Sequence, residues 1–286
     1  MKALLLPMLT CPVCRKSLKF AGGASDDRLL NGVLRCFSGH LYQIKDEIPI
    51  LKDPKLSEKE FSWNIEFPSV EKYDEIRKEY SSYLSEELRK ADETLLNEIA
   101  SSISNENLIL DIASGMGSLL LALSRKLSTD GLVIGTDIDE KSLRGAKLKL
   151  EEQRSYKQIS LCVMDGKFLA IKSRKLTCVT SYFGFDNIPE TKKAFQEAFR
   201  VLMPKGRLIF ANLWFKEGSM SLALAEKFGF GAIATKDKLF QTLEETGFKI
   251  DSTDEFYIGQ WPYNPMDLLP LEGDWFAHVL VKAHRK

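Results

Sequence analysis

The spacing of apolar residues changes twice along the chain. Up to residue 52 the apolar runs are short and are separated by turn-forming residues. Between residues 70 and 100 apolar side chains recur at near-helical spacing in an acidic background. From residue 108 onward, short apolar stretches alternate with segments of helical period, which is typical of βαβ units and a parallel sheet. The pattern predicts three segments, namely an N-terminal module over 1–52, a helical linker over 53–106 and an α/β domain over 107–286.

The α/β domain is expected to contain seven strands separated mainly by helices. The predicted strands are Leu108–Ala113, Leu132–Asp137, Ile159–Met164, Leu176–Tyr182, Arg207–Trp214, Lys249–Tyr257 and Trp275–Ala283. The predicted helices are Ser118–Leu127, Glu140–Glu152, Glu190–Leu202 and Lys236–Thr246. Residues 1–9 are interpreted as a strand that leads into the module, because they lack the small-residue cleavage site of a signal peptide.

Composition and charge exclude several classes of protein. Forty Lys and Arg residues balance forty Asp and Glu residues, and 44% of the residues are apolar, which are ordinary values for a soluble globular chain. No apolar run approaches the roughly 18 residues that span a bilayer, so no membrane span is expected. Residues 1–52 carry eight basic against four acidic residues, so this module would have to supply the basic patch for a nucleic-acid partner.

Cysteines with the spacing of metal ligands occur in the N-terminal module. Cys11 and Cys14 flank two residues, and Cys36 and His40 form a second pair. Two such pairs can hold one tetrahedral ion, which predicts a structural Zn²⁺ site with no open position for catalysis. The alternative is a set of isolated buried thiols with a surface histidine. Because a 50-residue module buries little core, the metal is expected to supply much of its folding free energy. This cysteine usage favours a reducing compartment, the cytoplasm.

A glycine-containing turn follows the first predicted strand of the α/β domain. The run Leu108-Ile109-Leu110-Asp111-Ile112-Ala113-Ser114-Gly115-Met116-Gly117-Ser118 lets the backbone turn tightly at its glycines and approach a ligand closely. A dinucleotide-binding turn would need a third small residue where the chain has Leu120. The carboxylate of Asp111 would repel a pyrophosphate and suits a ligand with positive charge. S-adenosylmethionine meets these requirements, because it carries an ammonium and a sulfonium and no phosphate.

Two further acids end the next two strands. Asp137 is placed to accept hydrogen bonds from both ribose hydroxyls, and Ile138 to lie against an adenine face. Asp165, followed by Gly166, is placed to accept from the adenine amine. Each acid alone would be interpreted as a helix cap or a solvated turn. Because open α/β sheets bind ligands at the carboxyl ends of their strands, the three acids together predict one cofactor site.

With these motifs the chain resembles the class I S-adenosylmethionine-dependent methyltransferases, and within them the ubiquinone and menaquinone C-methyltransferases. The resemblance spans about residues 100–286 and implies a Rossmann-like seven-stranded methyltransferase sheet. It rests on the motifs Asp111 to Gly117, Gly135-Thr136-Asp137, Met164-Asp165-Gly166, Tyr182 to Ile188 and Arg200 to Gly206. The cofactor-binding residues it implies are Asp111, Ala113, Ser114, Gly115, Gly117, Asp137, Ile138, Asp165, Gly166 and Tyr182. The family usually has glycine where this chain has Ala113, and an aspartate where it has Leu176-Thr177.

The N-terminal module has a resemblance of its own. Residues 3–52 are similar to small zinc-binding proteins that activate RNA and protein methyltransferases. The similarity is carried by Cys11-Pro12-Val13-Cys14, Cys36 and the run Leu41 to Leu51. Gln43 and Glu47 depart from that family's pattern, which has proline and glycine at these positions.

The segment after the fourth predicted strand is expected to separate the cofactor from the methyl acceptor. Asp186 is its only acid, which makes it the candidate catalytic base or acceptor anchor, with a turn cap as the alternative. The aromatic loop 261–266 is expected to border the acceptor site. His278 and His284 are interpreted as core or surface residues. Aromatic residues of the linker are expected either to form a lid or to pack on the main domain; these are Phe61, Trp63, Phe67 and Tyr73.

The predicted function is an S-adenosylmethionine-dependent methyltransferase that acts on a small molecule, quinone-like or another metabolite. The alternative is an rRNA or tRNA methyltransferase that uses the zinc module for substrate recognition. A scaffold protein without activity is disfavoured by the intact acids at positions 111, 137 and 165. A basic rim continuous with the zinc module would favour RNA, and a closed apolar cavity would favour a metabolite. The expected partners are this methyl acceptor, small molecule or RNA, and a second copy of the chain in a homo-oligomer.

Overall fold

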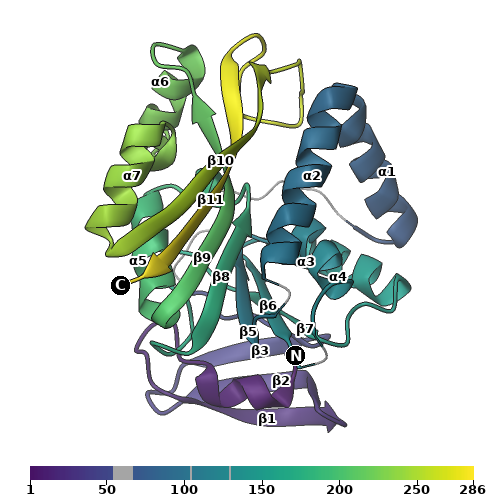
Figure 1. Ribbon diagram of the computed structural model, residues 1–286. Coiled ribbons are helices and arrows are strands. Elements are labelled where there is room, and N and C mark those ends of the chain that lie inside the picture. Colours follow the sequence, from purple (N-terminus) through teal and green to yellow (C-terminus); the bar gives the residue numbers. More distant parts are fainter. Residues whose placement is uncertain (54–66, 104, 129) are drawn as a thin grey trace.

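The protein contains two sheets of different size. The computed structural model describes residues 1–53, 67–103, 105–128 and 130–286. A four-stranded sheet forms in the N-terminal module, and a seven-stranded sheet forms in the α/β domain. Figure 1 shows the four-stranded sheet beneath one end of the larger sheet, with helices α1 (Val70–Ser82) and α2 (Glu86–Ser102) beside the opposite end.

The N-terminal module is an antiparallel sheet in chain order. Its strands are β1 (Leu18–Ser25), β2 (Arg28–Cys36), β3 (Leu41–Lys45) and β4 (Ile48–Pro49). The strand expected over residues 1–9 is wrong, because Ala3–Met8 form a 3₁₀ helix, η1. The three-residue period of η1 turns Leu5 and Met8 towards the core and leaves Leu4 exposed, an arrangement that the two-residue period of a strand would not give.

All seven strands expected in the α/β domain are present, which confirms the Rossmann-like seven-stranded sheet. The sheet has the order β10-β11-β9-β8-β5-β6-β7. Every pairing is parallel except the two made by β11, which lies antiparallel between β9 and β10. The connection from β10 to β11 contains no helix, so the chain returns in the opposite direction. The strands are β5 (Leu108–Ile112), β6 (Leu132–Asp137), β7 (Ile159–Val163), β8 (Leu176–Tyr182), β9 (Leu202–Phe215), β10 (Phe248–Gln260) and β11 (Trp275–Arg285).

Strand β9 and one helix differ from the prediction. Strand β9 begins at Leu202, which pairs with Leu176, although the prediction placed a turn there and started the strand at Arg207. Lys205 has φ +62°, a local irregularity that allows pairing on both sides of the expected turn. Helix α6 (Met220–Lys227) was not predicted, because only eight residues with two buried positions give little periodic signal.

Helices cover both faces of the large sheet. One face carries Ile109, Val133 and Cys178, which pack in one core with residues of α2, α3 (Ser118–Ser124) and α4 (Glu140–Glu152). The other face carries Leu110, Ile134 and Val179, which pack with α5 (Thr191–Val201), α7 (Lys236–Glu245) and the N-terminal module. Alternate residues of each strand therefore belong to different cores, as the pleat of a strand requires.

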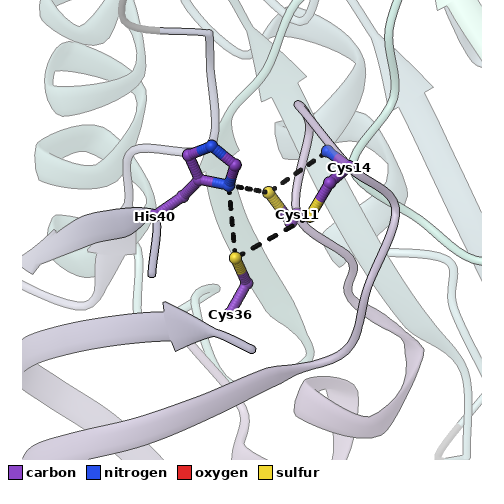
Figure 2. A group of neighbouring side chains, drawn as sticks. All are labelled: Cys11, Cys14, Cys36 and His40. Atoms are coloured by element: carbon purple, nitrogen blue, oxygen red, sulfur yellow. Dashed lines mark hydrogen bonds between the residues drawn. The ribbon is translucent and has the colours of Figure 1, made fainter. Parts of the chain in front are cut away.

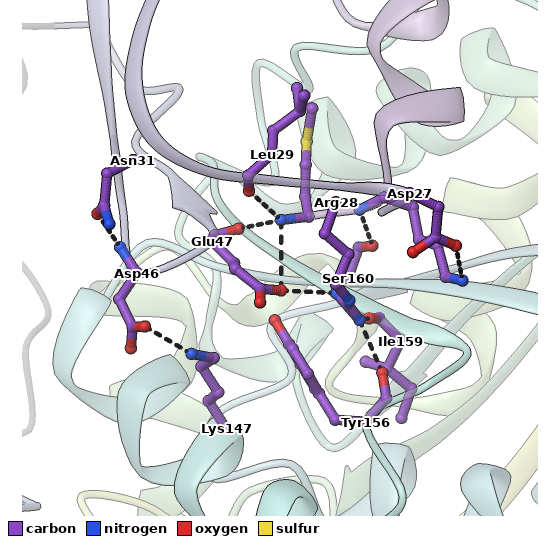
Figure 3. A network of polar contacts seen from close by, with 12 residues as sticks. Asp27, Arg28, Leu29, Asn31, Asp46, Glu47, Lys147, Tyr156, Ile159 and Ser160 are labelled. Carbon is purple, nitrogen blue, oxygen red and sulfur yellow. Dashed lines mark hydrogen bonds and ion pairs between the residues drawn. The ribbon is translucent and has the colours of Figure 1, made fainter. Parts of the chain in front are cut away.

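A polar network joins the N-terminal module to the α/β domain (Figure 3). The guanidinium of Arg28 lies 2.7 Å from the Glu47 carboxylate and donates, over 2.8 Å, to the carbonyl oxygens of Tyr156 and Ile159. The Lys147 ammonium of α4 lies 2.8 Å from the Asp46 carboxylate. Main-chain bridges between residues 9 and 171 and between residues 50 and 163 add to this junction. The module is thus held by charge, backbone pairing and a shared apolar core.

Candidate active site and metal centre

A cavity of about 1270 Å³ lies at the carboxyl ends of β5, β6, β7 and β8. Pockets for one small molecule commonly occupy about 300–1,000 Å³, so this volume has room for two ligands side by side. Helices α1 and α2 and the loop between β10 and β11 complete its wall. The residues expected at the site that line it are Asp111, Ala113, Ser114, Gly115, Asp137, Ile138, Asp165, Gly166, Tyr182 and Asp186.

The glycine-containing turn presents open backbone to this cavity. Gly115 has φ +50°, and a Cβ at this position would have no atom within 4 Å, so the backbone is free to approach a ligand. Gly117 has φ +81°, and its Cβ would lie 2.8 Å from the Cβ of Ala146 in α4. Gly117 does not line the cavity. Its absent side chain allows the start of α3 to pack closely against α4.

Ala113 is held in the conformation that glycine prefers. Its φ is +53°, in the left-handed region that costs an L-residue about 1–2 kcal/mol. Glycine would remove this strain, but its greater conformational freedom in the unfolded chain offsets part of the gain in stability. We expect Ala113→Gly to raise the free energy of unfolding by about 0.5–1 kcal/mol in urea titrations. Ala122→Gly, in the right-handed helix α3, should lower it by about 1 kcal/mol. Destabilisation by both changes would contradict this interpretation.

Asp111 ends β5 with a carboxylate that is only partly paired. It is 1% exposed; Oδ1 accepts a 3.0 Å hydrogen bond from the Thr180 hydroxyl, whereas Oδ2 has no partner among the described residues. Burial raises the pKa of this carboxyl to about 7. A cation at Oδ2 would restore the charged form, because it would offset the desolvation of the carboxylate. The ammonium of an amino acid is such a cation.

Asp137 ends β6 and holds the glycine-containing turn after β5 by a hydrogen bond. Its Oδ2 accepts a 2.8 Å hydrogen bond from the Gly115 N–H, and its Oδ1 accepts a 2.9 Å hydrogen bond from the Asp139 N–H. Burial raises the pKa of Asp137 to about 6, although these N–H groups act in the opposite direction. Each carboxylate oxygen can accept a second hydrogen bond. One lone pair on each oxygen is therefore left for a ligand with two neighbouring hydroxyl groups.

Asp165 ends β7 at the next position along the sheet. Its Oδ1 accepts a 2.8 Å hydrogen bond from the Lys167 N–H, and its Oδ2 has no partner in the described parts of the chain. Burial raises the pKa of this carboxyl. A Cβ on the following Gly166 would lie 2.8 Å from the Ile188 side chain, so glycine keeps the segment close to the wall after β8.

The wall after β8 contains two aromatic residues and Asp186. The Tyr182 hydroxyl donates a 3.2 Å hydrogen bond to the backbone carbonyl of Asp92 in α2, and the Tyr182 and Phe183 rings lie 4.7 Å apart. Phe183 has φ +50°, a strained conformation of the kind often found at functional sites. Neither carboxyl oxygen of Asp186 has a partner among the described residues, and burial raises the pKa of Asp186 to about 7.

The part of the cavity away from the three strand-end acids is largely apolar. Its lining includes Leu84, between α1 and α2, and Phe215 of β9. Trp261 and Met266 of the aromatic loop after β10 line it as well. Phe67 and Tyr73 are buried and pack together with Met116, which supports a packing role. Phe61 and Trp63 lie outside the described residues. Acidic residues outnumber basic residues among those that line the cavity as a whole.

Sequence reasoning missed several polar residues in this apolar part. Asp92 of α2 and His278 of β11 line the cavity, with Asp92 Oδ1 only 2.6 Å from His278 Nδ1. Asp267 lines it as well, and burial and the Asp92 charge raise the pKa of its carboxyl to about 6. Asp92 lies in an acidic helix and His278 in an apolar strand, so no local motif links them. Only a contact between distant segments could reveal the pair.

The four expected metal ligands lie together at one place. The ligand atoms of Cys11, Cys14, Cys36 and His40, which we call the Cys/His cluster, are all within 4.8 Å of one another (Figure 2). His40 Nδ1 lies 3.4 Å from Cys11 Sγ and 3.3 Å from Cys36 Sγ, and the Cys14 and Cys36 sulfurs are 3.8 Å apart. A tetrahedron with metal–sulfur bonds of about 2.3 Å has sulfur–sulfur edges of about 3.8 Å. The cluster has the dimensions of a zinc site.

Backbone and side-chain groups contact the sulfurs of the Cys/His cluster. The Cys14 N–H donates to Cys11 Sγ over 3.4 Å, and the Tyr42 hydroxyl lies 3.0 Å from the same sulfur. A hydrogen bond from the Lys16 backbone lowers the pKa of the Cys14 thiol to about 6, whereas burial raises that of Cys11. All three cysteines are free thiols. Such contacts to the sulfurs orient metal ligands in known sites.

Comparison with known sequences identifies the family of the chain. The model of the ubiE/COQ5 methyltransferase family matches residues 65–230, a segment that includes the three strand-end acids and Asp186. The chain belongs to the ubiE/COQ5 methyltransferase family. The Cys/His cluster and strands β10 and β11 lie outside the matched segment.

Two curated relatives show how far the similarity extends. The ubiquinone/menaquinone biosynthesis C-methyltransferase UbiE of Marinomonas sp. (strain MWYL1) is 28% identical over 139 residues, which cover 49% of this chain and 55% of that protein. The UbiE protein of Yersinia pestis (strain Pestoides F) is 36% identical over 101 residues, which cover 35% of this chain and 40% of that protein. The chain therefore matches these relatives over about half of their length or less.

Solved structures of methyltransferases share the fold. A putative methyltransferase from Bacillus halodurans C-125 superposes with a TM-score of 0.51 at 17% identity and covers 67% of this chain and 97% of its own. A geranyl diphosphate methyltransferase in complex with SAM superposes with a TM-score of 0.53 at 12% identity. The match covers 68% of this chain and 84% of that chain. At these identities the likeness establishes the fold alone. Within the described residues no helix is both long and apolar enough to cross a membrane.

Proposed function

We propose that the protein is an S-adenosylmethionine-dependent methyltransferase that acts on a small molecule. The observation that carries this proposal is the meeting of Asp111, Asp137 and Asp165 around one cavity with room for a second ligand. Unpartnered buried oxygens on Asp111 and Asp165 supply acceptors for a ligand with donor groups. Membership of the ubiE/COQ5 family supports the same reaction.

The residues present fit S-adenosylmethionine. Asp111 would pair with its ammonium, Asp137 would accept from the ribose hydroxyls, and Asp165 would accept from the adenine amine. Ala113, Ser114 and Gly115 would approach the methionine part through their backbone, and Ile138, Gly166 and Tyr182 would border the nucleoside. When bound, this cofactor supplies a methyl group that leaves its sulfur without the bonding electrons. The protein's part is then to align the acceptor and exclude water.

The acceptor is a small molecule rather than RNA in this proposal. The two curated relatives named above act in quinone biosynthesis according to their names. The acceptor part of the cavity is largely apolar, and the lining as a whole has an excess of acidic residues, which would repel a phosphate backbone. The four-stranded sheet lies at the other end of the molecule from α1 and α2, which border this part of the cavity (Figure 1).

Asp186 would contact the acceptor directly. Its carboxyl lines the cavity beside the apolar wall and has two unpaired oxygens. With a pKa of about 7 it exists in both protonation states near neutral pH, so that it can donate or accept a hydrogen bond. We assign to it the anchoring of a polar group on the acceptor.

The Cys/His cluster would bind one structural Zn²⁺. Three thiols and one imidazole at tetrahedral spacing are the donors that zinc prefers, and they leave no open position for a substrate. Because these thiols must remain reduced to bind metal, we place the protein in the cytoplasm. The zinc would stabilise the module that packs against the edge of the large sheet.

The cofactor assignment makes a prediction about Asp137. Replacing it by alanine removes a charge-assisted acceptor for the ribose, so we expect S-adenosylhomocysteine to bind about 10- to 150-fold more weakly, which corresponds to about 1.5–3 kcal/mol. Isothermal titration calorimetry measures this directly. Because Asp137 also accepts from the Gly115 and Asp139 N–H groups, Asp137→Asn serves as a second variant that preserves part of this pairing.

The matched control is Asp254→Ala, which removes an exposed carboxylate of β10 outside the cavity. It should bind S-adenosylhomocysteine as the unmodified protein does. Equal affinities for all variants, or a preference of the protein for a nicotinamide dinucleotide, would refute the cofactor assignment. With binding established, a screen of metabolite and RNA pools with methyl-labelled cofactor identifies the acceptor. Labelling of RNA alone would refute the small-molecule assignment.

A further inference from the structure

A buried imidazole and a partly buried carboxylate form a pair in the acceptor part of the cavity. His278 is 3% exposed, and its Nδ1 is 2.6 Å from Oδ1 of Asp92. An imidazole nitrogen with a free lone pair would be repelled by a carboxylate at this distance, so we assign a proton to Nδ1. In the neutral imidazole the other nitrogen, Nε2, then has a free lone pair.

Nε2 is the free end of this pair. His278 lines the cavity, and none of the hydrogen bonds among the described residues involves its Nε2. Its Nδ1 and Asp92 Oδ1 meet at ion-pair distance without the alignment of a hydrogen bond. Asp92 is fixed from the other side, because its backbone carbonyl accepts the hydrogen bond of Tyr182 from the wall after β8. The arrangement places an imidazole in the cavity lining beside the Asp92 carboxylate.

Aromatic rings surround His278. The ring of Phe183 lies 4.5 Å from the imidazole, centroid to centroid, and that of Phe276 lies 4.9 Å away. Tyr257 and Trp261 follow at 6.2 and 6.3 Å. Phe183 belongs to the wall after β8 and has the strained φ of +50°. These rings exclude water from the imidazole, which strengthens its interaction with the Asp92 carboxylate.

The same strand carries a second histidine–aspartate pair that serves as a comparison. His284 Nδ1 lies 2.7 Å from Asp251 Oδ1, nearly the same distance as in the buried pair. This pair is solvent-exposed, and neither residue lines the cavity. Its position gives it no access to a ligand.

From these observations we infer that His278 is the catalytic base for the methyl acceptor and that Asp92 is its positioning residue. The inference rests on the proposed methyl transfer. An acceptor atom that carries a proton gives that proton to Nε2 and keeps the electron pair. This pair forms the bond to the incoming methyl carbon. The imidazolium is stabilised by Asp92 and returns its proton to solvent after the product leaves. Asp186 anchors the acceptor and need not take the proton.

A purely structural pair would be a costly way to connect α2 to β11. Buried charges lose their hydration, and apolar residues of similar size often stabilise a fold as well or better. A structural histidine would also be expected to have a partner for its second nitrogen. A structural role leaves unexplained why His278 lines the cavity with no hydrogen bond to its Nε2 among the described residues.

Nitrogen NMR of the full-length protein tests the arrangement without cofactor or acceptor. We expect neutral His278 to carry its proton on Nδ1, and Asp92→Asn to shift the tautomer towards Nε2–H. The chain has three histidines, so His278 is assigned with the help of His284→Gln and of the response of His40 to zinc removal. A neutral His278 with its proton on Nε2 in the unmodified protein would overturn the inference.

Kinetics on the acceptor found by the pool screen tests the chemical role. His278→Gln is expected to lower kcat by about 10²- to 10⁴-fold and Asp92→Asn by about 10²-fold, with the affinity for S-adenosylhomocysteine unchanged. His284→Gln should leave both quantities unchanged. Methyl transfer at the normal rate by a folded His278→Gln or Asp92→Asn variant would overturn the inference and leave the proposed function intact. The Asp137→Ala titration tests that function separately.

Discussion

Replacing Cys14 by serine is expected to release zinc from the N-terminal module and to loosen both ligand loops. A serine hydroxyl stays protonated at neutral pH and cannot replace a thiolate, and structural zinc contributes on the order of 10 kcal/mol to small modules of this kind. We expect about one zinc per chain in the unmodified protein and much less in Cys14→Ser by elemental analysis. Amide hydrogen exchange should become faster around residues 11–16 and 36–40, while β5 to β8 keep their protection.

The control for this change is Cys178→Ala. Cys178 is a buried free thiol on β8, far along the chain from the Cys/His cluster. Its loss should lower the stability of the main core and leave the zinc content unchanged. Full zinc occupancy in Cys14→Ser, together with unchanged exchange in the two loops, would show that the ligand set is wrong.

Asp186→Asn is expected to stabilise the protein at high pH and to impair it as an enzyme. Burial raises the pKa of Asp186 to about 7 from an ordinary value of 3.8. Between these values the unfolded chain has lost the proton and the folded protein has kept it, so the contribution of Asp186 to stability falls as the pH rises towards 7. Asparagine does not titrate. The variant's advantage in free energy of unfolding should therefore grow by about 1.36 kcal/mol per pH unit from pH 5 to about pH 7 and then level off, so that it is about 3 kcal/mol larger at pH 8 than at pH 5.

Urea titrations at pH 5 and pH 8 measure this difference. Asp111 and Asp137 also have raised pKa values, but they titrate in both proteins and cancel in the comparison. Asp254→Asn, an exposed control, should show no growth of its advantage with pH. On the acceptor from the pool screen, Asp186→Asn should raise KM and leave cofactor affinity unchanged. An advantage that does not change with pH would mean that Asp186 is ionised in the folded protein throughout this range.

Local patterns in the sequence were sufficient for the large sheet and for the Cys/His cluster. Strands β5 to β8 lie where apolar runs predict them, since a strand buried between two helical layers must be apolar along its whole length. The three acids follow their strands directly, so a parallel sheet necessarily brings them to one edge. The metal ligands occur as two closely spaced pairs, and the β1–β2 hairpin between them has only to fold back for the pairs to meet.

The tertiary structure alone decided the features that depend on contacts between distant segments. Nothing in the run Trp275–Arg285 shows that β11 is antiparallel, because its direction follows from the helix-free connection and from pairing with both β9 and β10. The 3₁₀ helix at residues 3–8 formed because Leu5 and Met8 could reach the core next to Ile171. The N-terminal module, which the sequence indicated would depend on its metal, also shares an apolar core with the main domain.

The acceptor part of the cavity is where sequence reasoning was least informative. The sequence could rank Asp186 as a candidate because it follows a predicted strand in apolar company. It could not pair Asp92 with His278, since a charged residue on an acidic helix and a histidine in an apolar strand each have an ordinary local explanation. Their contact exists only because α2 packs across β11, and the free energy of that packing comes from apolar side chains elsewhere on the two elements. Periodicity records which face of an element is buried, whereas the partner of that face is set by the whole fold.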